Sequence, residues 1–419
     1  STGVAARRRR PHRELPMDLE FGPEYEALRE RVREFLAASW PPPPDAAGGD
    51  AKAQAIAFRR EAIAQGFLAR NIPRAYGGSE QPFDPLAAQV IREEFTRAHA
   101  PMEQAGIGTM MLVPTLLERG EEWMKEKWVE ATLVGEVLWC QGYSEPNAGS
   151  DLASLETRGE LVGDEWVIHG QKIWTSGAHL ADYMFALVRT EPDAGKHAGI
   201  SYLLLDMRQP GIEVRPLRMM TGAADFNEVF LDGARTPAHW IVGRRGEGWT
   251  VSRTTLKHER NSIGNAALTR MQFDALVRLA RDAGRLGDPT VQQRLAEIEG
   301  YVLAHQWTGY RQLSADAHGR SAGIVQMMNK LHSTNIGDML ARAALDLLGD
   351  DGLLVAGERV GERAPADRRA WIAQYMYSLG IAIAGGAANI QRNVIAERGL
   401  GLPRDAAADR SAARAGGAR

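Results

Sequence analysis

The spacing of apolar residues changes twice along this 419-residue chain, and that double change constrains the fold more than any other feature. In residues 24–39, apolar side chains recur every three or four positions, which predicts an amphipathic helix. Between residues 139 and 249 the sequence consists of short β-branched or aromatic runs bounded by turns, which is typical of strands. Helical spacing then returns almost to the end. We therefore expect a mainly α protein with a central β domain.

Each of the three parts of the chain contains several expected helices or strands. Helices are expected in the first block at residues 24–39, 54–65, 86–97 and 121–133. Strands are expected in the second at residues 165–169, 183–188, 200–205, 212–216 and 228–231. Gly163-Asp164 lies between two such runs and predicts a tight hairpin in a small barrel or sandwich. Long helices at residues 250–283, 291–317, 323–348 and 368–398 predict a four-helix bundle.

The domain boundaries follow from these segments. We assign residues 18–138 to an N-terminal helical domain, 139–249 to a small β-barrel and 250–404 to a C-terminal four-helix bundle. Residues 1–17 are expected to be a disordered leader and residues 405–419 a mobile tail, because both have little to bury. The four arginines at residues 7–10 precede no apolar segment, so they do not predict a secretory signal. A transit peptide or a polyanion-binding arm remains the alternative for them.

Charge and cysteine content exclude several classes of protein. Lys+Arg 50 and Asp+Glu 53 give a net charge of -3, which provides no overall field for nucleic acid or an anionic membrane. No apolar stretch is long enough to span a bilayer. The single cysteine, Cys140, excludes an internal disulfide and is expected to serve packing. We therefore expect a soluble, cytoplasmic protein without nucleic-acid or membrane partners.

Several common motifs are absent. The sequence has no complete dinucleotide-binding fingerprint and no Walker sequence. The ten histidines show no metal-ligand spacing, so we predict no metal. Residues 142–146 approach the nucleophile elbow of hydrolases, but the final glycine is replaced by Pro146. A cofactor, if bound, is expected in a pocket between domains.

Four sequence blocks carry a resemblance to a known family. Residues 143–151 read Tyr-Ser-Glu-Pro-Asn-Ala-Gly-Ser-Asp, and residues 170–176 read Gly-Gln-Lys-Ile-Trp-Thr-Ser. Residues 227–230 read Asn-Glu-Val-Phe, and residues 390–398 read Ile-Gln-Arg-Asn-Val-Ile-Ala-Glu-Arg before Gly-Leu-Pro-Arg at 401–404. In order and spacing these blocks resemble the acyl-CoA dehydrogenase family over most of the chain.

The resemblance implies FAD-dependent α,β-dehydrogenation of an acyl-CoA thioester. A base takes a proton from Cα, a hydride leaves Cβ for flavin N5, and electron-transfer flavoprotein receives the electrons. In the family, the positions matched by Trp174 and Ser176 cover the flavin and hydrogen-bond N5, and Ser144 hydrogen-bonds its pyrimidine edge. Ser150 is expected to touch both cofactor and substrate. The full set of expected cofactor contacts is Gln141, Tyr143, Ser144, Gly149, Ser150, Trp174, Thr175, Ser176, Ala387 and Asn389.

The position of the catalytic base departs from the commoner family pattern. The usual glutamate is replaced by Gly385, whose backbone N–H can still polarise the thioester carbonyl. A minority of the family carries the glutamate on the first helix of the bundle, and this implies Glu259 as the base. Its helical neighbours Leu256 and Ile263 form a partly apolar stripe, which suits a general base; an exposed, solvated glutamate is the alternative. Expected substrate contacts are Ser150, Leu256, Arg260 and Gly385.

Other consequences concern substrate and assembly. Glycine at position 385 leaves space, which favours a branched, long or bulky acyl chain. The resemblance also implies a homotetramer or dimer, although the Arg-x-x-Phe sequence that reaches a neighbouring flavin is not matched within residues 281–287. The alternatives are a weakly active partner subunit of a heteromeric dehydrogenase, a flavin oxygenase or nucleic-acid-binding protein of the same fold, and a non-enzymatic structural role.

Overall fold

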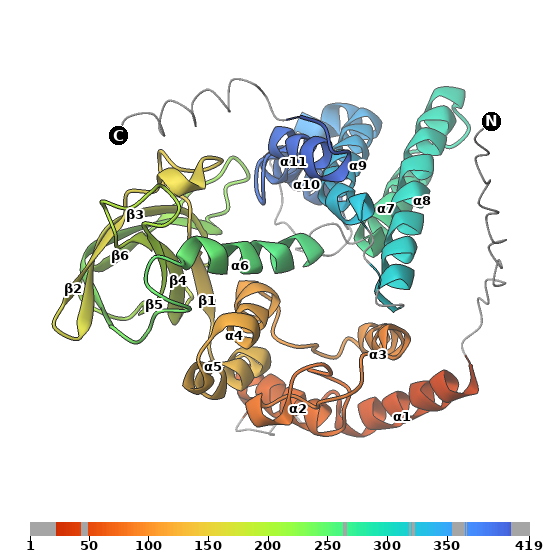
Figure 1. Ribbon diagram of the computed structural model, residues 1–419. Helices are drawn as coiled ribbons and strands as arrows, with labels where there is room; N and C mark the ends of the chain where they lie inside the picture. The colour runs from red at the N-terminus through yellow and green to blue at the C-terminus, as the bar shows by residue number, and fades with distance from the viewer. Residues whose placement is uncertain are drawn as a thin grey trace, which may run out of the picture.

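A computed structural model describes residues 22–42, 49–262, 266–317, 320, 323–353, 365 and 367–403. The leader and tail expected at residues 1–17 and 405–419, with the arginines at 7–10, lie outside this part of the chain. The expected fold class is confirmed: a helical domain, a curled sheet and a helical bundle follow one another (Figure 1). None of the described helices is long and apolar enough to cross a membrane.

The first domain consists of helices close to the expected ranges. Its elements are α1 (Pro23–Ser39), α2 (Ala51–Ala64), η2 (Arg74–Tyr76), α3 (Pro85–Arg97), the π-helical η3 (Gly108–Leu112), α4 (Val113–Arg119) and α5 (Glu122–Val134). Helix α3 begins where the Asp84 side chain accepts hydrogen bonds from the N–H groups of Leu86 and Ala87. Apolar side chains of α1, α2, α3 and α5 share one core, which holds these helices together.

A buried ion-pair cluster joins α1 to α3. Glu94 accepts hydrogen bonds from Arg29 at 2.9 Å, from Arg33 at 3.1 Å and from Arg97 at 2.8 Å. Burial acts to raise the pKa of Glu94, but the three guanidinium groups outweigh burial and lower it to about 2. These ion pairs hold the charged side of α1 against α3, in addition to the apolar contacts between the two helices.

The central domain is one curled sheet. Its strands are β1 (Trp139–Gly142), β2 (Arg158–Val162), β3 (Glu165–Ser176), β4 (Tyr183–Arg189), β5 (Ile200–Asp206), β6 (Ile212–Leu217) and β7 (Phe226–Pro237), with η4 (Leu152–Ser154) after β1. The strand order is β1-β4-β2-β3-β7-β6, and β5 pairs with β4. The hairpin expected at Gly163-Asp164 is present, with Val162 opposite Glu165. β3 is longer than expected and carries an irregularity between Lys172 and Thr175.

The C-terminal helices are more divided than their apolar spacing indicates. The elements are α6 (Gly248–Ser262), α7 (Ala266–Asp282), α8 (Pro289–Ala317), α9 (Ile324–Leu348), η5 (Gly349–Leu353), α10 (Arg368–Ile381), α11 (Ala388–Val394) and the π-helical η6 (Ile395–Gly399). The helix expected at residues 368–398 ends early because Gly385 and Gly386 have φ values of 61° and 94°. The helix expected at residues 250–283 is α6 and α7, with Gly264 in the undescribed interval.

Helix α6 is not part of the bundle. The bundle consists of α7, α8, α9 and α10, whereas α6 packs on α4, η3, β4 and β5 and touches α9 only at one end. Figure 1 shows α6 running from the sheet toward the bundle, above α4. The structure thus divides the helix expected at residues 250–283, and its first part, α6, packs mainly on the other two domains. Helix α6 instead bridges all three regions, so its side chains face the space where they meet.

Candidate active site

A buried ion pair fixes the loop that follows β1. Lys172 donates hydrogen bonds to Glu145 Oε1 at 2.7 Å and to the Leu187 carbonyl at 2.8 Å. Glu145 also accepts from the N–H groups of Glu156 at 2.6 Å and Thr157 at 3.0 Å. Burial acts to raise the pKa of Glu145, but Lys172 and these donors outweigh it and hold that pKa below its ordinary value. Residues 143–151, which we call the signature loop, are thus held to the sheet by the charged carboxylate of Glu145.

The same loop meets β3 where Trp174 leaves the sheet. The Ile173 N–H donates to the Ser144 carbonyl at 2.9 Å. Trp174 has φ 59°, a left-handed value that is rare for a non-glycine residue, and its side chain is 59% exposed. Ser176 is exposed on the same face, whereas the Thr175 side chain is buried on the other. Of residues 174–176, Trp174 and Ser176 therefore have exposed side chains, whereas that of Thr175 is buried.

The remaining expected contacts of this loop are spread around it. Gln141 is half-buried in β1, where it lies opposite Phe185 of β4. Tyr143 is buried, and its ring packs edge-on against Phe185 and Tyr202. Gly149 and Ser150 are exposed, and nothing stands within 4 Å of where a Cβ of Gly149 would be. The backbone of the loop at Gly149 is therefore open to a ligand, whereas the start of the loop is fixed by the packed Tyr143 ring.

Helix α6 is oriented by hydroxyl contacts one turn before Glu259. The hydroxyls of Thr255 and Thr115 are 3.0 Å apart, and Thr255 lies 3.4 Å from the Tyr202 hydroxyl. On another face, His258 Nε2 lies 2.7 Å from Glu118 Oε1. Because residues four apart lie on one side of a helix, Glu259 follows Thr255 toward the junction of loop and bundle.

Glu259 is half-buried, and its charge acts on groups from two other regions. Burial foremost, with Tyr202 and Glu259 adding to it, raises the pKa of Tyr143 well above its ordinary value, so this phenol stays protonated. Glu259 also acts on the Lys330 ammonium of α9. Glu259 thus lies near both the signature loop and the bundle. The side chain of Arg260 and residue Ile263 fall outside the described part of the chain.

The position of the usual family base is a tight turn between α10 and α11. Gly385 has no side chain to offer, and its carbonyl accepts a hydrogen bond from Gln391 at 3.1 Å. Lys330 donates to the carbonyls of Ala382 at 3.3 Å and Gly386 at 2.9 Å. Two other expected cofactor contacts lie next to this turn: Ala387 is the N-cap residue of α11, and the exposed Asn389 accepts a hydrogen bond from Arg392 at 3.2 Å. The expected substrate contact Leu256 lies on α6, where it is half-buried and packs on the apolar core.

These residues fit a flavin. An exposed indole on a left-handed backbone offers a flat face, and the nearby residues Ser176, which is exposed, and Ser144, which is half-buried, carry hydroxyl groups. The open space beside Gly149 admits a bulky group to the backbone. When bound, FAD would be held by Trp174, Ser176 and Ser144 and would supply a two-electron acceptor.

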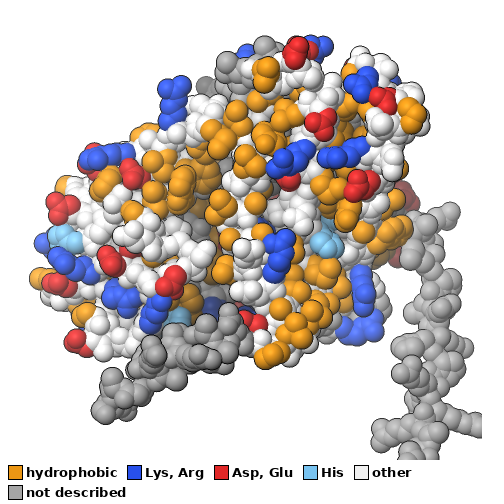
Figure 2. Space-filling model, turned by 90° about the horizontal axis from the view of Figure 1, so that it is seen from above, with side chains coloured by type: hydrophobic (Ala, Val, Ile, Leu, Met, Phe, Trp, Pro, Cys, Tyr) orange, Lys and Arg blue, Asp and Glu red, His pale blue; other side chains and the backbone are white. Residues whose placement is uncertain are grey.

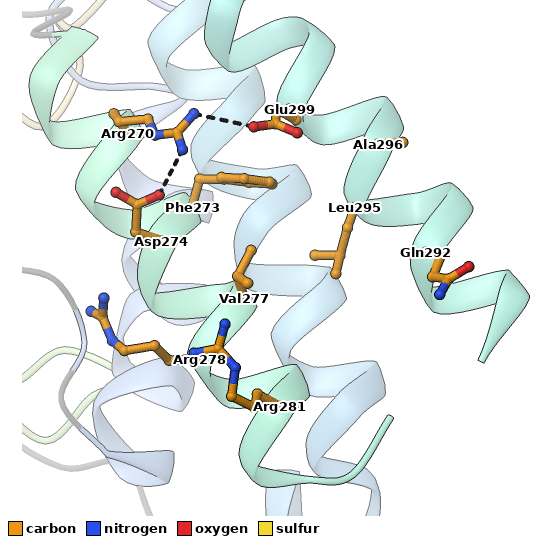
Figure 3. Close-up of a pocket in the computed structure, with 10 residues that line it drawn as sticks. All are labelled: Arg270, Phe273, Asp274, Val277, Arg278, Arg281, Gln292, Leu295, Ala296 and Glu299. Atoms are coloured by element: carbon orange, nitrogen blue, oxygen red, sulfur yellow. Dashed lines mark hydrogen bonds and ion pairs between the residues drawn. The ribbon is translucent and has the colours of Figure 1, made fainter. Parts of the chain in front are cut away.

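A hollow of about 590 Å³ lies elsewhere, between α7 and α8. Figure 3 shows Arg270 paired with Asp274 and Glu299 at one end, with Phe273, Val277 and Leu295 along it. None of the residues predicted for the site lines this hollow. It is therefore separate from the arrangement around Glu259.

Two buried lysines near the predicted residues, Lys172 and Lys330, were not among those expected from the sequence. Lys172 occupies a fully buried position of β3, between the half-buried Gln171 and Ile173, and a lysine buried in a strand signals an ion pair. Lys330 follows a Met-Met-Asn run in α9 and precedes Leu331, which is a weaker signal of the same kind. Cys140 is buried in the core of the sheet, and burial raises the pKa of its thiol, so it serves packing.

Comparison with known proteins agrees with this arrangement. Residues 22–136, 140–234 and 246–400 match the N-terminal, middle and C-terminal domains of acyl-CoA dehydrogenases. Acyl-CoA dehydrogenase IpdE1 of Mycobacterium tuberculosis (strain ATCC 25618 / H37Rv) is 38% identical over 358 residues, 84% of this chain and 88% of that protein. IpdE1 of Mycolicibacterium smegmatis (strain ATCC 700084 / mc(2)155) is 40% identical over 334 residues, 75% of this chain and 80% of that protein.

Solved structures agree over nearly the whole chain. The structure titled "Tcur3481-Tcur3483 steroid ACAD" has a TM-score of 0.74 and 28% identity, covering 93% of this chain and 100% of that one. The ChsE4-ChsE5 complex from Mycobacterium tuberculosis has a TM-score of 0.73 and 27% identity, with coverage of 93% and 100%. The chain therefore belongs to the acyl-CoA dehydrogenase family of oxidoreductases, which uses FAD.

Proposed function

We propose that this acyl-CoA dehydrogenase removes hydrogens from Cα and Cβ of a bulky acyl-CoA, with Glu259 as the base. The observation that carries the proposal is the placement of α6, whose Thr255 lies against the hydroxyls of Thr115 and Tyr202 one turn before the half-buried Glu259. This placement supports a carboxylate at the junction of the loop after β1 and the bundle, and its influence on the pKa of Tyr143 and of Lys330 agrees with that position. At the usual family position, Gly385 has no carboxylate to offer.

The reaction divides among residues of the chain. Glu259 takes the Cα proton onto its carboxylate, and the Gly385 N–H donates to the thioester carbonyl, which makes that proton more acidic. Tyr143 remains neutral beside the carboxylate. When bound, FAD would supply the two-electron acceptor for the hydride that leaves Cβ. We propose that electron-transfer flavoprotein then receives the electrons, as elsewhere in the family.

The size of the substrate is proposed from two observations. Gly385 has no side chain to fill the space expected beside the reacting carbons, and the similar Tcur3481-Tcur3483 protein is a steroid acyl-CoA dehydrogenase. We therefore expect branched, long or polycyclic acyl groups to be better substrates than short straight ones. Anaerobic bleaching of the flavin with short, branched, long and steroid side-chain acyl-CoAs measures this preference; equal rates across the panel would contradict it.

Glu259→Gln tests the base. The variant keeps the shape of the side chain but cannot accept the proton, so we expect flavin reduction by the best acyl-CoA to slow about 10³-fold. Stopped-flow absorbance of the flavin measures this rate. Glu118→Gln is the matched control, because Glu118 meets α6 on its His258 face and should leave the rate unchanged.

A second function is a subunit that binds flavin or shapes a pocket beside an active partner chain. Two similar structures, Tcur3481-Tcur3483 and the ChsE4-ChsE5 complex, each combine two different chains, which favours this alternative. In that case the chain alone would fail to bleach with any acyl-CoA, and Glu259→Gln would leave the activity of a reconstituted complex unchanged.

A further inference from the structure

Lys330 is a buried cation that the reaction as described does not use. Its side chain rises from α9 and is 2% exposed. An ammonium in such a place needs partners, because burying a charge without them costs several kcal/mol. The Lys330 ammonium donates hydrogen bonds to two backbone carbonyls, those of Ala382 at 3.3 Å and Gly386 at 2.9 Å.

Both carbonyls belong to the turn that carries Gly385. With Gln391 bound to the Gly385 carbonyl, three carbonyls of this short turn are held by donors from α9 and α11. Gly386 cannot be replaced easily, since its φ is 94° and a Cβ would lie 2.5 Å from Gln391 Nε2. Within the described residues, the Gly385 N–H has no hydrogen-bond partner. The turn is therefore anchored through its carbonyls, and that N–H is left for another acceptor.

Helices α6 and α9, which carry Glu259 and Lys330, contact each other, and the Glu259 carboxylate acts electrostatically on the Lys330 ammonium. Burial lowers the pKa of Lys330, and the negative charge of Glu259 acts against that shift. Among the described residues, Glu259 acts electrostatically on the neutral Tyr143 after β1 and on the cationic Lys330 of α9. Lys257 and His258, on α6 itself, pair with Glu118 instead.

We propose that Lys330 is a positioning residue for the reaction: it holds the Gly385 N–H toward the thioester carbonyl and places a positive charge near the base Glu259. The inference rests on the proposed function and deepens it. One side chain thereby links the two groups that act on the substrate, the oxyanion donor and the proton acceptor. A lysine with a merely structural role would hold the turn without affecting the charge state of Glu259.

Three substitutions separate these roles in the full-length, FAD-loaded protein. Lys330→Met removes donor and charge, Lys330→Gln keeps a donor, and Lys330→Arg keeps both. Lys257→Met is the matched control, because this lysine lies two residues from Glu259 and pairs with Glu118 on the other face of α6. Each variant is measured by the pH profile of kcat/KM with the best acyl-CoA and by peptide-level hydrogen exchange across residues 380–391.

A nearby cation disfavours the protonated, uncharged form of a carboxylic acid. Without it, Glu259 binds its proton more readily, so the acidic limb of the profile should move upward by about one pH unit in Lys330→Met and Lys330→Gln. In Lys330→Arg and in Lys257→Met, the acidic limb of the kcat/KM profile should lie at the same pH as in the wild type. Hydrogen exchange across the turn should be faster in Lys330→Met than in Lys330→Gln, a readout that needs no turnover.

Two failures are distinguishable. If the wild type reduces its flavin and Glu259→Gln abolishes this, but the limb stays in place in Lys330→Met and Lys330→Gln, the inference is wrong and the proposed function stands. If Glu259→Gln reacts like the wild type, the proposed function is wrong and the inference falls with it. Should Lys330→Met fail to fold, Lys330→Gln and Lys330→Arg decide the question.

Discussion

Trp174 combines backbone strain with exposure of a large aromatic ring. Its φ of 59° costs roughly 1–2 kcal/mol for a side chain that carries a Cβ. Its indole touches Phe226 edge-on and is otherwise largely open. Strain and exposed apolar surface both lower stability, so their coincidence at one residue points to a ligand that covers the ring.

Replacing Trp174 should separate stability from flavin binding. In both Trp174→Ala and Trp174→Gly we expect the affinity of the apoprotein for FAD to fall about tenfold or more, since the stacking surface is lost. Trp174→Gly should also be more stable than Trp174→Ala by about 1 kcal/mol, because glycine accepts the left-handed backbone. Calorimetric titration and thermal unfolding of the apoproteins measure the two effects.

Phe83→Ala serves as the control for loss of an exposed aromatic ring, because Phe83 lies in the N-terminal domain, just before α3. It should bind FAD as the wild type does. An unchanged FAD affinity in Trp174→Ala would show that the indole does not cover the flavin.

At the scale of elements, the Glu145–Lys172 pair joins the signature loop to β3. Lys172 is wholly buried, and Glu145 is nearly so. The pair also binds backbone groups of β4 and of the segment before β2. A charged pair in this position ties four segments together, so that loss of either partner leaves a buried charge.

Removing one partner should cost more than removing both. We expect Lys172→Met to lower the free energy of unfolding by about 3–5 kcal/mol, because Glu145 stays buried without its cation. The double variant Glu145→Gln, Lys172→Met should lose less than the sum of the single changes. Denaturant unfolding of all four proteins measures the coupling; additive losses would contradict it.

The pair also predicts a dependence on pH. The pKa of Glu145 is lowered in the folded state, so its contribution to stability is complete above the ordinary glutamate value of about 4.3 and is lost as the pH falls through the lower folded value. The stability difference between wild type and Glu145→Gln should therefore narrow below about pH 4. Unfolding curves at pH 7 and below pH 4 check the sign.

At the scale of the molecule, the bundle exposes more apolar surface than a monomer needs. Leu303, Trp307 and Tyr310 follow one another at i, i+4 and i+7 along α8, and all three are exposed. Figure 2 shows hydrophobic side chains gathered in patches on the face seen from above. Exposed apolar stripes of this kind mark interaction surfaces.

We propose that another subunit, in a homotetramer or dimer, covers this stripe. Light scattering should give a mass that is a multiple of 45.9 kDa. Trp307→Glu should shift the protein toward smaller species, since a charge in an apolar interface costs several kcal/mol. Phe83→Glu, on the N-terminal domain, should not. A monomeric wild type that forms a complex only with a second dehydrogenase chain would favour the heteromeric alternative.

The sequence by itself determined the local structure. Apolar spacing of about 3.6 or 2 residues is set within a dozen positions, and this is enough to predict α1, α3 and most strands. The signature residues 143–151 and 170–176 likewise named the family without any tertiary information. Secondary structure and sequence motifs depend on residues close together in the chain, so both can be predicted from the sequence.

Only the tertiary structure decided which distant groups meet. It took α6 out of the bundle, and it brought together Lys172 with Glu145, 27 residues apart, and Lys330 with Gly386, 56 residues apart. The side chain of a lysine is the same in a solvated helix and in a buried one. Its role depends on the path of the whole chain, because the partners that stabilise a buried charge come from other elements.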